Sequence, residues 1–192
     1  MSKPLVAVVG RPNVGKSTFF NKVVGRRVSI VEDTPGVTRD RIYAEAEWKG
    51  IHFALIDTGG IEPDSKDIIL SQMRHQAEMA MDTSDVILFM VDGKEGITAA
   101  DREVASMLMK TGKKIVLAVN KIDKAELPDD FYDFYELGLG EPIPISAANM
   151  LNLGDLLDEI TQRLPEPQQA EEKEHRLAIA VVGKPNAGKS SL

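Results

Sequence analysis

Residues 5–17, Leu-Val-Ala-Val-Val-Gly-Arg-Pro-Asn-Val-Gly-Lys-Ser, decide the fold of this chain. Five apolar residues of a strand lead into a loop that Gly10 and Gly15 allow to curl around a phosphate, with its N–H groups pointing inward. A helix-compatible run over 17–24 follows, and its N-terminus adds a partial positive charge. Strand, loop and helix in this order predict a Walker A phosphate-binding loop, with Lys16 on the β- and γ-phosphates and the Ser17 hydroxyl on Mg²⁺.

The same loop occurs a second time, because residues 183–190 read Gly-Lys-Pro-Asn-Ala-Gly-Lys-Ser. A polar, acidic, proline-containing segment over 165–175 precedes it and is typical of an exposed linker. We therefore expect a first nucleotide-binding domain over 1–164, a linker over 165–175, and over 176–192 the truncated start of a second such domain, with its first strand and loop. On this pattern the chain is expected to be a piece of a longer tandem protein.

Composition narrows the possible classes of protein. The 192 residues suit one domain and a tail, and 43% hydrophobic with only 5% aromatic residues suits an aliphatic α/β core. The absence of cysteine excludes disulfide, zinc–thiolate and thiol-nucleophile chemistry. Residues 5–9 are too short for the apolar part of a signal peptide, and no apolar run is long enough to span a membrane. We expect a cytoplasmic protein with no membrane partner.

Charge is distributed unevenly along the chain. The net charge is −7, but residues 1–41 hold eight Lys/Arg and three Asp/Glu, a balance of +5, which leaves −12 for the rest. An additional RNA-binding face is one interpretation of the basic excess. We favour charge matching to a triphosphate, because the excess surrounds the loop and the whole chain is acidic. The basic residues are Lys3, Arg11, Lys16, Lys22, Arg26, Arg27, Arg39 and Arg41.

Strand-like and helix-like runs alternate along residues 1–164. Apolar runs predict strands over 5–9, 86–91, 113–119 and 143–145, and the pair 42–48 and 51–56 predicts an antiparallel hairpin. Helical patterns cover 67–81, 98–110 with Thr98 as the cap, 129–137 and 152–164. Together they predict an α/β P-loop fold, a mostly parallel six-stranded sheet with helices on both faces and one antiparallel edge strand.

Three further motifs follow expected strands, at the sheet edge where ligands of open α/β sheets bind. In Asp57-Thr58-Gly59-Gly60 the carboxylate can hold Mg²⁺ through water, and the Gly60 N–H can meet the γ-phosphate. In Asn120-Lys121-Ile122-Asp123 the Asp123 carboxylate can accept hydrogen bonds from guanine N1–H and its exocyclic amine, which adenine does not offer in that arrangement. The Lys121 stem can lie along the base, and Asn120 can tie two loops together. Ser146-Ala147-Ala148 can offer a backbone N–H to guanine O6.

A turn-rich stretch over 29–41 lies between the first helix and the hairpin. Its Thr38 is the candidate second hydroxyl ligand of Mg²⁺, engaged only when a γ-phosphate is present. Two neighbours of Thr38 suggest competing interpretations of this stretch. Thr34 could be a capping residue, and Arg39 could contact a phosphate. The segments 29–41 and 57–72 are therefore expected to change order between nucleotide states.

These residues resemble the five motifs of the translation-factor class of GTPases, over about the first 164 residues. Pro-Asn-Val-Gly-Lys-Ser (12–17) and Asp-Thr-Pro-Gly-Val-Thr-Arg-Asp (33–40) resemble its Era-like branch, and the repeated loop after an acidic linker resembles the EngA (Der) family of tandem GTPases. The resemblance implies GTP/GDP and Mg²⁺ as ligands, and the large ribosomal subunit or its RNA as partner. The KH-like domain of that family has no counterpart in these 192 residues.

The resemblance also implies how hydrolysis is assisted. Ile61 stands where many signalling GTPases have a glutamine that orients water, and its side chain has no polar group. In the Era-like branch a potassium ion (K⁺) can take the place of an arginine finger, held by an asparagine at the position of Asn13, and Arg39 is a rival source of charge. The candidate catalytic residues are Lys16, Thr38, Gly60 and Asn13.

The leading hypothesis is a GTPase that acts as a conformational switch and has slow intrinsic GTP hydrolysis. The alternatives are a nucleotide-dependent binding module with negligible hydrolysis and, less favoured, a small-molecule kinase. The residues expected to contact the nucleotide are Gly10, Arg11, Pro12, Asn13, Val14, Gly15, Lys16, Ser17, Thr18, Asp57, Thr58, Gly59, Gly60, Asn120, Lys121, Asp123, Ser146, Ala147 and Ala148. Ser17, Thr38 and Asp57 are the expected metal ligands.

Overall fold

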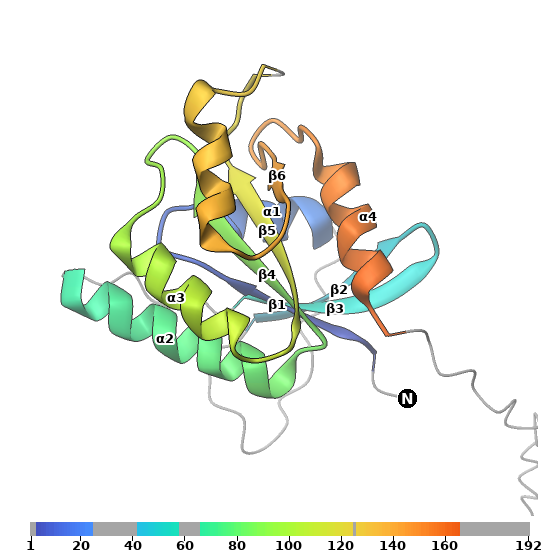
Figure 1. Ribbon diagram of the computed structural model, residues 1–192. Helices are drawn as coiled ribbons and strands as arrows, with labels where there is room; N and C mark the ends of the chain where they lie inside the picture. Colours follow the sequence, from blue (N-terminus) through green and yellow to red (C-terminus); the bar gives the residue numbers. More distant parts are fainter. Residues whose placement is uncertain (1–2, 25–41, 58–65, 125, 166–192) are drawn as a thin grey trace, which may run out of the picture.

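In the part of the chain that the structure describes, a six-stranded sheet lies at the centre (Figure 1). The computed structural model describes residues 3–24, 42–57, 66–124 and 126–165. The strand order is β2-β3-β1-β4-β5-β6, and every neighbouring pair is parallel except the hairpin of β2 and β3. The predicted mostly parallel sheet with one antiparallel edge strand is therefore confirmed. The strands are β1 (Leu5–Val9), β2 (Ile42–Trp48), β3 (Ile51–Asp57), β4 (Val86–Asp92), β5 (Lys114–Asn120) and β6 (Pro142–Pro144).

Helices cover both faces of this sheet (Figure 1). Side chains of α1 and α4 pack on one face, and those of α2, α3 and the 3₁₀ helix η1 pack on the other. The helices are α1 (Lys16–Val24), α2 (Lys66–Thr83), α3 (Ala99–Met109), η1 (Asp129–Leu137) and α4 (Leu153–Arg163). The helix predicted over 129–137 thus has 3₁₀ geometry, and the last strand begins and ends one residue earlier than predicted.

The two layers of core follow from the two-residue repeat of the strands. In β1, Val6 and Val8 face α1 and α4, whereas Ala7 and Val9 face α2 and α3. All seven residues of β4 are buried, because this central strand is covered on both sides. The continuous apolar runs of the sequence therefore mark the strands at the centre of the sheet, and the alternating run of β2 marks its edge.

A capping box starts α3, as the sequence predicted for Thr98. The Thr98 hydroxyl accepts from the Asp101 N–H at 3.3 Å, and Asp101 Oδ2 accepts from the Thr98 N–H at 2.9 Å. Two otherwise unpaired N–H groups of the first turn are satisfied in this way. The reciprocal bonds fix the position of the Asp101 side chain, which is fully buried.

The register of the parallel strands brings their carboxyl ends together. Val8 of β1 lies opposite Asp57 of β3, and Asp92 of β4 lies opposite Asn120 of β5. Asp57, Asp92 and Asn120 are each the last residue of their strand, so the predicted motifs meet along one edge of the sheet. The fold thereby collects polar side chains that lie far apart in the sequence.

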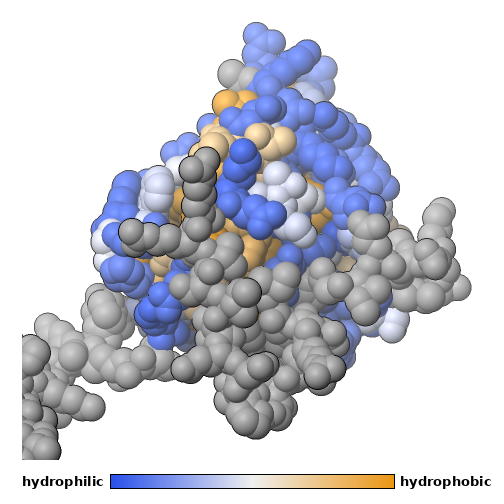
Figure 2. All heavy atoms as spheres, turned by 180° about the vertical axis from the view of Figure 1, so that it is seen from behind, coloured by the Kyte–Doolittle hydropathy of each residue, from blue (hydrophilic) through white to orange (hydrophobic). Residues whose placement is uncertain are grey.

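On the face seen in Figure 2, the described side chains are largely hydrophilic, and the hydrophobic ones gather near the middle. Within the described ranges, no helix combines the length and hydropathy needed to cross a bilayer.

Candidate nucleotide-binding site

The loop between β1 and α1 is shaped by two close approaches of its backbone. A Cβ on Gly10 would lie 2.4 Å from the carbonyl oxygen of Met90 in β4. A Cβ on Gly15, whose φ is +96°, would lie 2.2 Å from Asn120 Nδ2. Both positions therefore require glycine, one to pack the loop against the sheet and one to admit the Asn120 side chain. The glycine spacing that predicted a phosphate-binding loop thus has a packing reason in this structure.

Lys16 lies beneath this loop with its ammonium group directed inward. Only 7% of the residue is exposed, and Nζ donates to the carbonyl oxygens of Gly10 at 2.7 Å and Arg11 at 2.6 Å. Burial lowers the pKa of Lys16 to about 8, the nearby Asp57 carboxylate opposes this, and the Arg11 charge adds to it. The site therefore holds a buried cation that a nearby phosphate would stabilise.

Ser17 and Asp57 form a second polar pair beside the loop. The Ser17 hydroxyl donates to Asp57 Oδ2 at 3.4 Å, and Asp57 is 5% exposed. Mg²⁺ in nucleotide sites uses one or two protein ligands together with phosphate oxygens and water. A hydroxyl and a carboxylate this close suit that coordination, and no group of three or more His, Cys, Asp or Glu occurs in the described part of the chain. The pair thus fits a nucleotide-dependent Mg²⁺ site better than a dedicated protein cage.

Arg11, one of the basic residues near the loop, has acidic partners within the protein. Its Nε donates to Asp101 Oδ1 at 3.0 Å and its Nη1 to Glu95 Oε2 at 2.8 Å. Burial would lower the pKa of Arg11, but the Asp101 and Glu95 carboxylates outweigh it and raise the pKa. The Arg11 charge is therefore paired with carboxylates of α3 and of the loop before it. Its side chain anchors the loop.

Asn120 joins the phosphate-binding loop to the loop after β6. Its Nδ2 donates to the Val14 carbonyl oxygen at 2.7 Å, and its Oδ1 accepts from the Ala147 N–H at 2.9 Å. The residue is 3% exposed, so both bonds are shielded from water. A single amide thus holds together the two loops that the sequence assigns to phosphate and base.

Asp123 lies at the outer side of the same group. Its Oδ1 accepts from the Ser146 hydroxyl at 2.7 Å and from Asn149 Nδ2 at 3.1 Å, and its Oδ2 accepts from Lys94 Nζ at 2.6 Å. The hydrogen bond from Lys94, followed by that from Ser146, lowers the pKa of the Asp123 carboxyl. The carboxylate is therefore ionised and oriented, as an acceptor for the guanine edge needs to be.

The loop between β4 and α3 contributes residues that the sequence analysis did not select. Asp92 Oδ2 lies 2.5 Å from Lys121 Nζ, and Asp92 Oδ1 accepts from the N–H groups of Lys94 and Glu95. Burial favours a raised pKa for Asp92, but these bonds prevail and lower it. The position of Asp92 at the end of a buried strand was a usable signal, whereas nothing in the sequence around Lys94 indicated that it would reach Asp123.

The structure describes some of the remaining predicted site residues and not others. Asn13 and Thr18 are exposed, and Pro12 is half-buried. The Ala147 N–H is engaged by Asn120, so guanine O6 would share it or use the N–H of Ala148. Thr34, Thr38, Arg39, Thr58, Gly59, Gly60 and Ile61 lie outside the described residues, as does the second loop over 183–190.

Comparison with protein families gives a match over the loop and the sheet. Residues 5–121 match the family model described as "50S ribosome-binding GTPase". Over 192 residues the chain is 64% identical to a GTPase Der of Clostridium tetani and 62% identical to one of Clostridium novyi. The chain spans 44% of the length of these curated relatives.

Comparison with solved structures gives matches to proteins with a similar fold. A crystal structure of Aquifex aeolicus Era bound to GDP and AlF₄⁻ has a TM-score of 0.66 at 33% identity, covering 86% of this chain and 58% of that one. An Era complex with MgGDPNP and part of 16S ribosomal RNA has a TM-score of 0.65 at 34% identity and the same coverage. The G domain of the T. maritima FeoB iron transporter has a TM-score of 0.60 at 26% identity, covering 83% of this chain and 98% of that one.

Proposed function

The chain belongs to the family of 50S ribosome-binding GTPases, and we propose that it binds guanine nucleotides and hydrolyses GTP to GDP and phosphate as a conformational switch. The observation that carries the proposal is the Asn120 side chain, which joins Val14 of the phosphate-binding loop to Ala147 of the loop beside Asp123. One rigid amide between the two loops sets their spacing. A ligand with a purine at one end and phosphates at the other matches a site of that form.

Base selection is assigned to the Asp123 carboxylate. It is ionised, and Ser146 and Asn149 orient it from one side. Guanine N1–H and the exocyclic amine can donate to its two oxygens, whereas adenine would leave the carboxylate without those donors. The arrangement supports selection of guanine nucleotides.

Phosphate binding is assigned to the loop over 10–17 and to Lys16. The ammonium group exchanges its bonds with the Gly10 and Arg11 carbonyl oxygens for bonds to the β- and γ-phosphates. Ser17 and Asp57 would hold Mg²⁺, together with Thr38 in the GTP state. When bound, Mg²⁺ supplies charge that offsets the charge of the phosphates.

Hydrolysis is assigned to positioning and electrostatics, without a general base at position 61. Isoleucine there cannot orient water. The charge that builds on the bridging oxygen still needs compensation, which a cation can supply. We assign that role to K⁺, which Asn13 would help to hold, and the Lys16 ammonium and the Gly60 N–H would stabilise the γ-phosphate. Arg39 or a residue from a partner is the rival source of charge.

The cellular partner is proposed from the family. The matched model is described as ribosome-binding, and the relatives named GTPase Der extend beyond the 192 residues of this chain. We propose that the protein acts in the cytoplasm on the large ribosomal subunit or its RNA.

Single-turnover hydrolysis tests the enzymatic proposal. Purified chain in excess over radiolabelled GTP is assayed with Mg²⁺ in potassium and in sodium buffers of equal ionic strength. We expect release of phosphate, faster in potassium, and Asn13→Ala should remove most of the potassium advantage while GDP affinity stays nearly unchanged. Tight GDP binding without phosphate release in either salt would instead support a binding module. Equal rates in both salts, with a neutral Asn13→Ala, would reject the K⁺ role and favour Arg39.

A further inference from the structure

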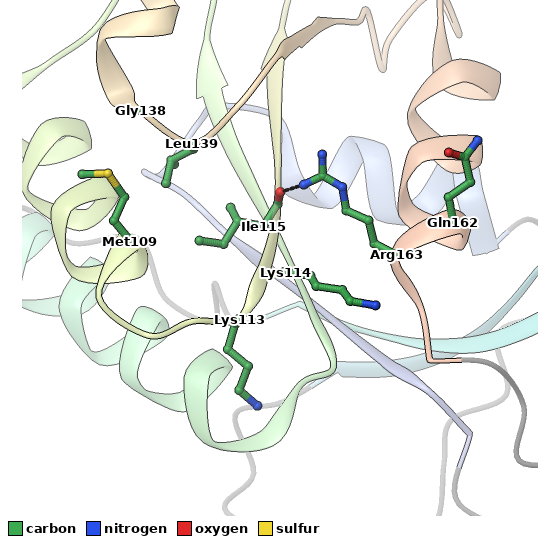
Figure 3. A pocket seen from close by; sticks show the side chains of 8 residues that line it. All are labelled: Met109, Lys113, Lys114, Ile115, Gly138, Leu139, Gln162 and Arg163. Atoms are coloured by element: carbon green, nitrogen blue, oxygen red, sulfur yellow. Dashed lines mark hydrogen bonds between the residues drawn. The ribbon is translucent and has the colours of Figure 1, made fainter.

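A hollow of about 510 Å³ lies at the end of the sheet opposite the nucleotide site. It is bounded by the start of β5, the end of α3, the turn after η1 and the end of α4 (Figure 3). β5 starts at Lys114 in the hollow and ends at Asn120 in the nucleotide site, so the two places are separated by the length of the strand. A ligand here would not compete with the nucleotide.

The hollow has an apolar floor. Ile115 and Leu139 are each 8% exposed, and Met109 of α3 is 50% exposed beside them. β6 pairs with residues 117–119 of β5, so among the described residues no strand lies beside the preceding part of β5 on that side. Arg163 of α4 reaches across and donates to the Ile115 carbonyl oxygen, as Figure 3 shows.

The rim of the hollow is basic. Lys113 Nζ donates to the Ser84 carbonyl oxygen at 2.8 Å, and Lys114 is exposed. No acidic side chain of the described residues forms an ion pair with either lysine, whereas Arg163 pairs with Glu159 at 2.5 Å. Two uncompensated ammonium groups beside an apolar floor favour an acidic segment that carries some small apolar residues.

We propose that residues 166–174 of this chain, Glu-Pro-Gln-Gln-Ala-Glu-Glu-Lys-Glu, bind in this hollow. They contain four glutamates and one lysine, a net charge of −3, which is complementary to the rim. They begin three residues after Arg163, which itself lines the hollow, and nine extended residues can reach ~30 Å, far enough to cross it. Attachment at one end gives the segment an effective concentration on the order of millimolar.

The sequence of this segment also lowers the cost of binding. Pro165 and Pro167 have a fixed φ and disfavour helical backbone at the residues before them, so the segment has fewer conformations to lose when it is held. Binding of this segment would fix the point at which the chain leaves the first domain, near residue 175. It would therefore also set the direction in which the second loop over 183–190 extends from that domain. This proposal is independent of the assigned GTPase chemistry.

Paramagnetic relaxation in the 192-residue chain tests it, because the chain has no cysteine and Ala170→Cys gives a single site for a nitroxide label. We expect selective loss of amide signal at Ile115, Gly138 and Leu139 at low salt, and recovery at high salt, where charge attraction is screened. Lys114→Glu should abolish the loss. Lys22→Glu, the same change on the exposed face of α1, should leave it intact.

Two outcomes would overturn the proposal. One is uniform or absent broadening in the parent chain, in spectra whose other amides confirm an intact fold. The other is selective broadening that persists unchanged in Lys114→Glu. A parallel titration with a short RNA duplex identifies the competing occupant: shifts of the same three amides, without broadening by the label, would reassign the hollow to nucleic-acid phosphates.

Discussion

Arg11 in the phosphate-binding loop donates from Nε to Oδ1 of Asp101 at the start of α3, over 3.0 Å, with the carboxylate fully buried. The other oxygen of Asp101 accepts from Thr98 and completes the helix cap. One carboxylate therefore fixes the phosphate-binding loop and the first turn of α3 to each other. A change on either side is expected to affect both.

Removing one member of this pair should destabilise the fold. Arg11→Met leaves a buried carboxylate without its cation, which typically costs ~3–5 kcal/mol. Urea unfolding of the parent, of Arg11→Met, of Asp101→Asn and of Arg11→Met/Asp101→Asn measures the effect. We expect the double variant to be more stable than the sum of the two single losses, because it leaves no unpaired charge. Strictly additive losses would show that the two side chains do not depend on each other.

Asn120→Asp should separate the two loops of the site. The new carboxylate can still accept from Ala147, but it cannot donate to the Val14 oxygen, and an unpaired buried acceptor costs ~1–3 kcal/mol. Calorimetric titration with GDP is expected to show a loss of about tenfold or more. Asn21→Asp, the same change at an exposed position of α1, provides the control. Equal GDP affinity in both variants would remove Asn120 from the site.

Base specificity should change in Asp123→Asn. The amide offers a donor where guanine also presents donors, so GDP should bind more weakly, whereas xanthosine diphosphate presents an acceptor at that position and should bind better. Competition between the two nucleotides for parent and variant chains is the measurement. GDP binding by Asp123→Asn as tight as in the parent would disprove the assignment.

Lys94 should compete with the base for the same carboxylate. Its ammonium lies 2.6 Å from Asp123 Oδ2, one of the two oxygens that guanine would use. Both side chains are partly exposed, so the pair is weak, and Lys94→Met is expected to tighten GDP binding by no more than about fivefold. Lys124→Met, at a neighbouring exposed lysine, should have no effect. Weaker GDP binding in Lys94→Met would mean instead that the lysine supports the base.

Nucleotide affinity should depend on pH through Lys16. Its pKa is about 8 in the folded chain and phosphates favour the charged form, so GDP affinity should be nearly constant below pH 7 and fall as pH rises through 8. The loss should reach at most about tenfold per pH unit. Lys16→Met should bind weakly without this pH dependence. An unchanged slope in Lys16→Met would assign the titration to another group.

The same group has the opposite effect on folding. Because the pKa of Lys16 is lowered from 10.5, the unfolded chain binds more protons than the folded chain between pH 8 and 10.5. The contribution of Lys16 to the free energy of unfolding should therefore rise with pH over that interval, while nucleotide affinity falls. Urea unfolding of parent and Lys16→Met at several pH values isolates this contribution.

Local patterns in the sequence were enough to predict most of the helices and strands and to suggest a nucleotide site. Buried strands appear as continuous apolar runs, as over 86–91, because a central strand meets helices on both faces. The glycines of the first loop and the Asn-Lys-Ile-Asp motif were visible because their spacing is local. Local patterns also placed the Thr98 cap and the antiparallel edge strand.

Which charged side chains form pairs became visible in the folded structure. Arg11 and Asp101 are 90 residues apart, and nothing in either local sequence shows that they pair. Lys94 and Asp123 also pair across loops that are distant in the sequence. They meet because parallel strands end at one edge of the sheet, where the order of the strands decides which loops are neighbours. Local composition fixes backbone conformation and burial, whereas the partner of a long charged side chain depends on which loops the fold places side by side.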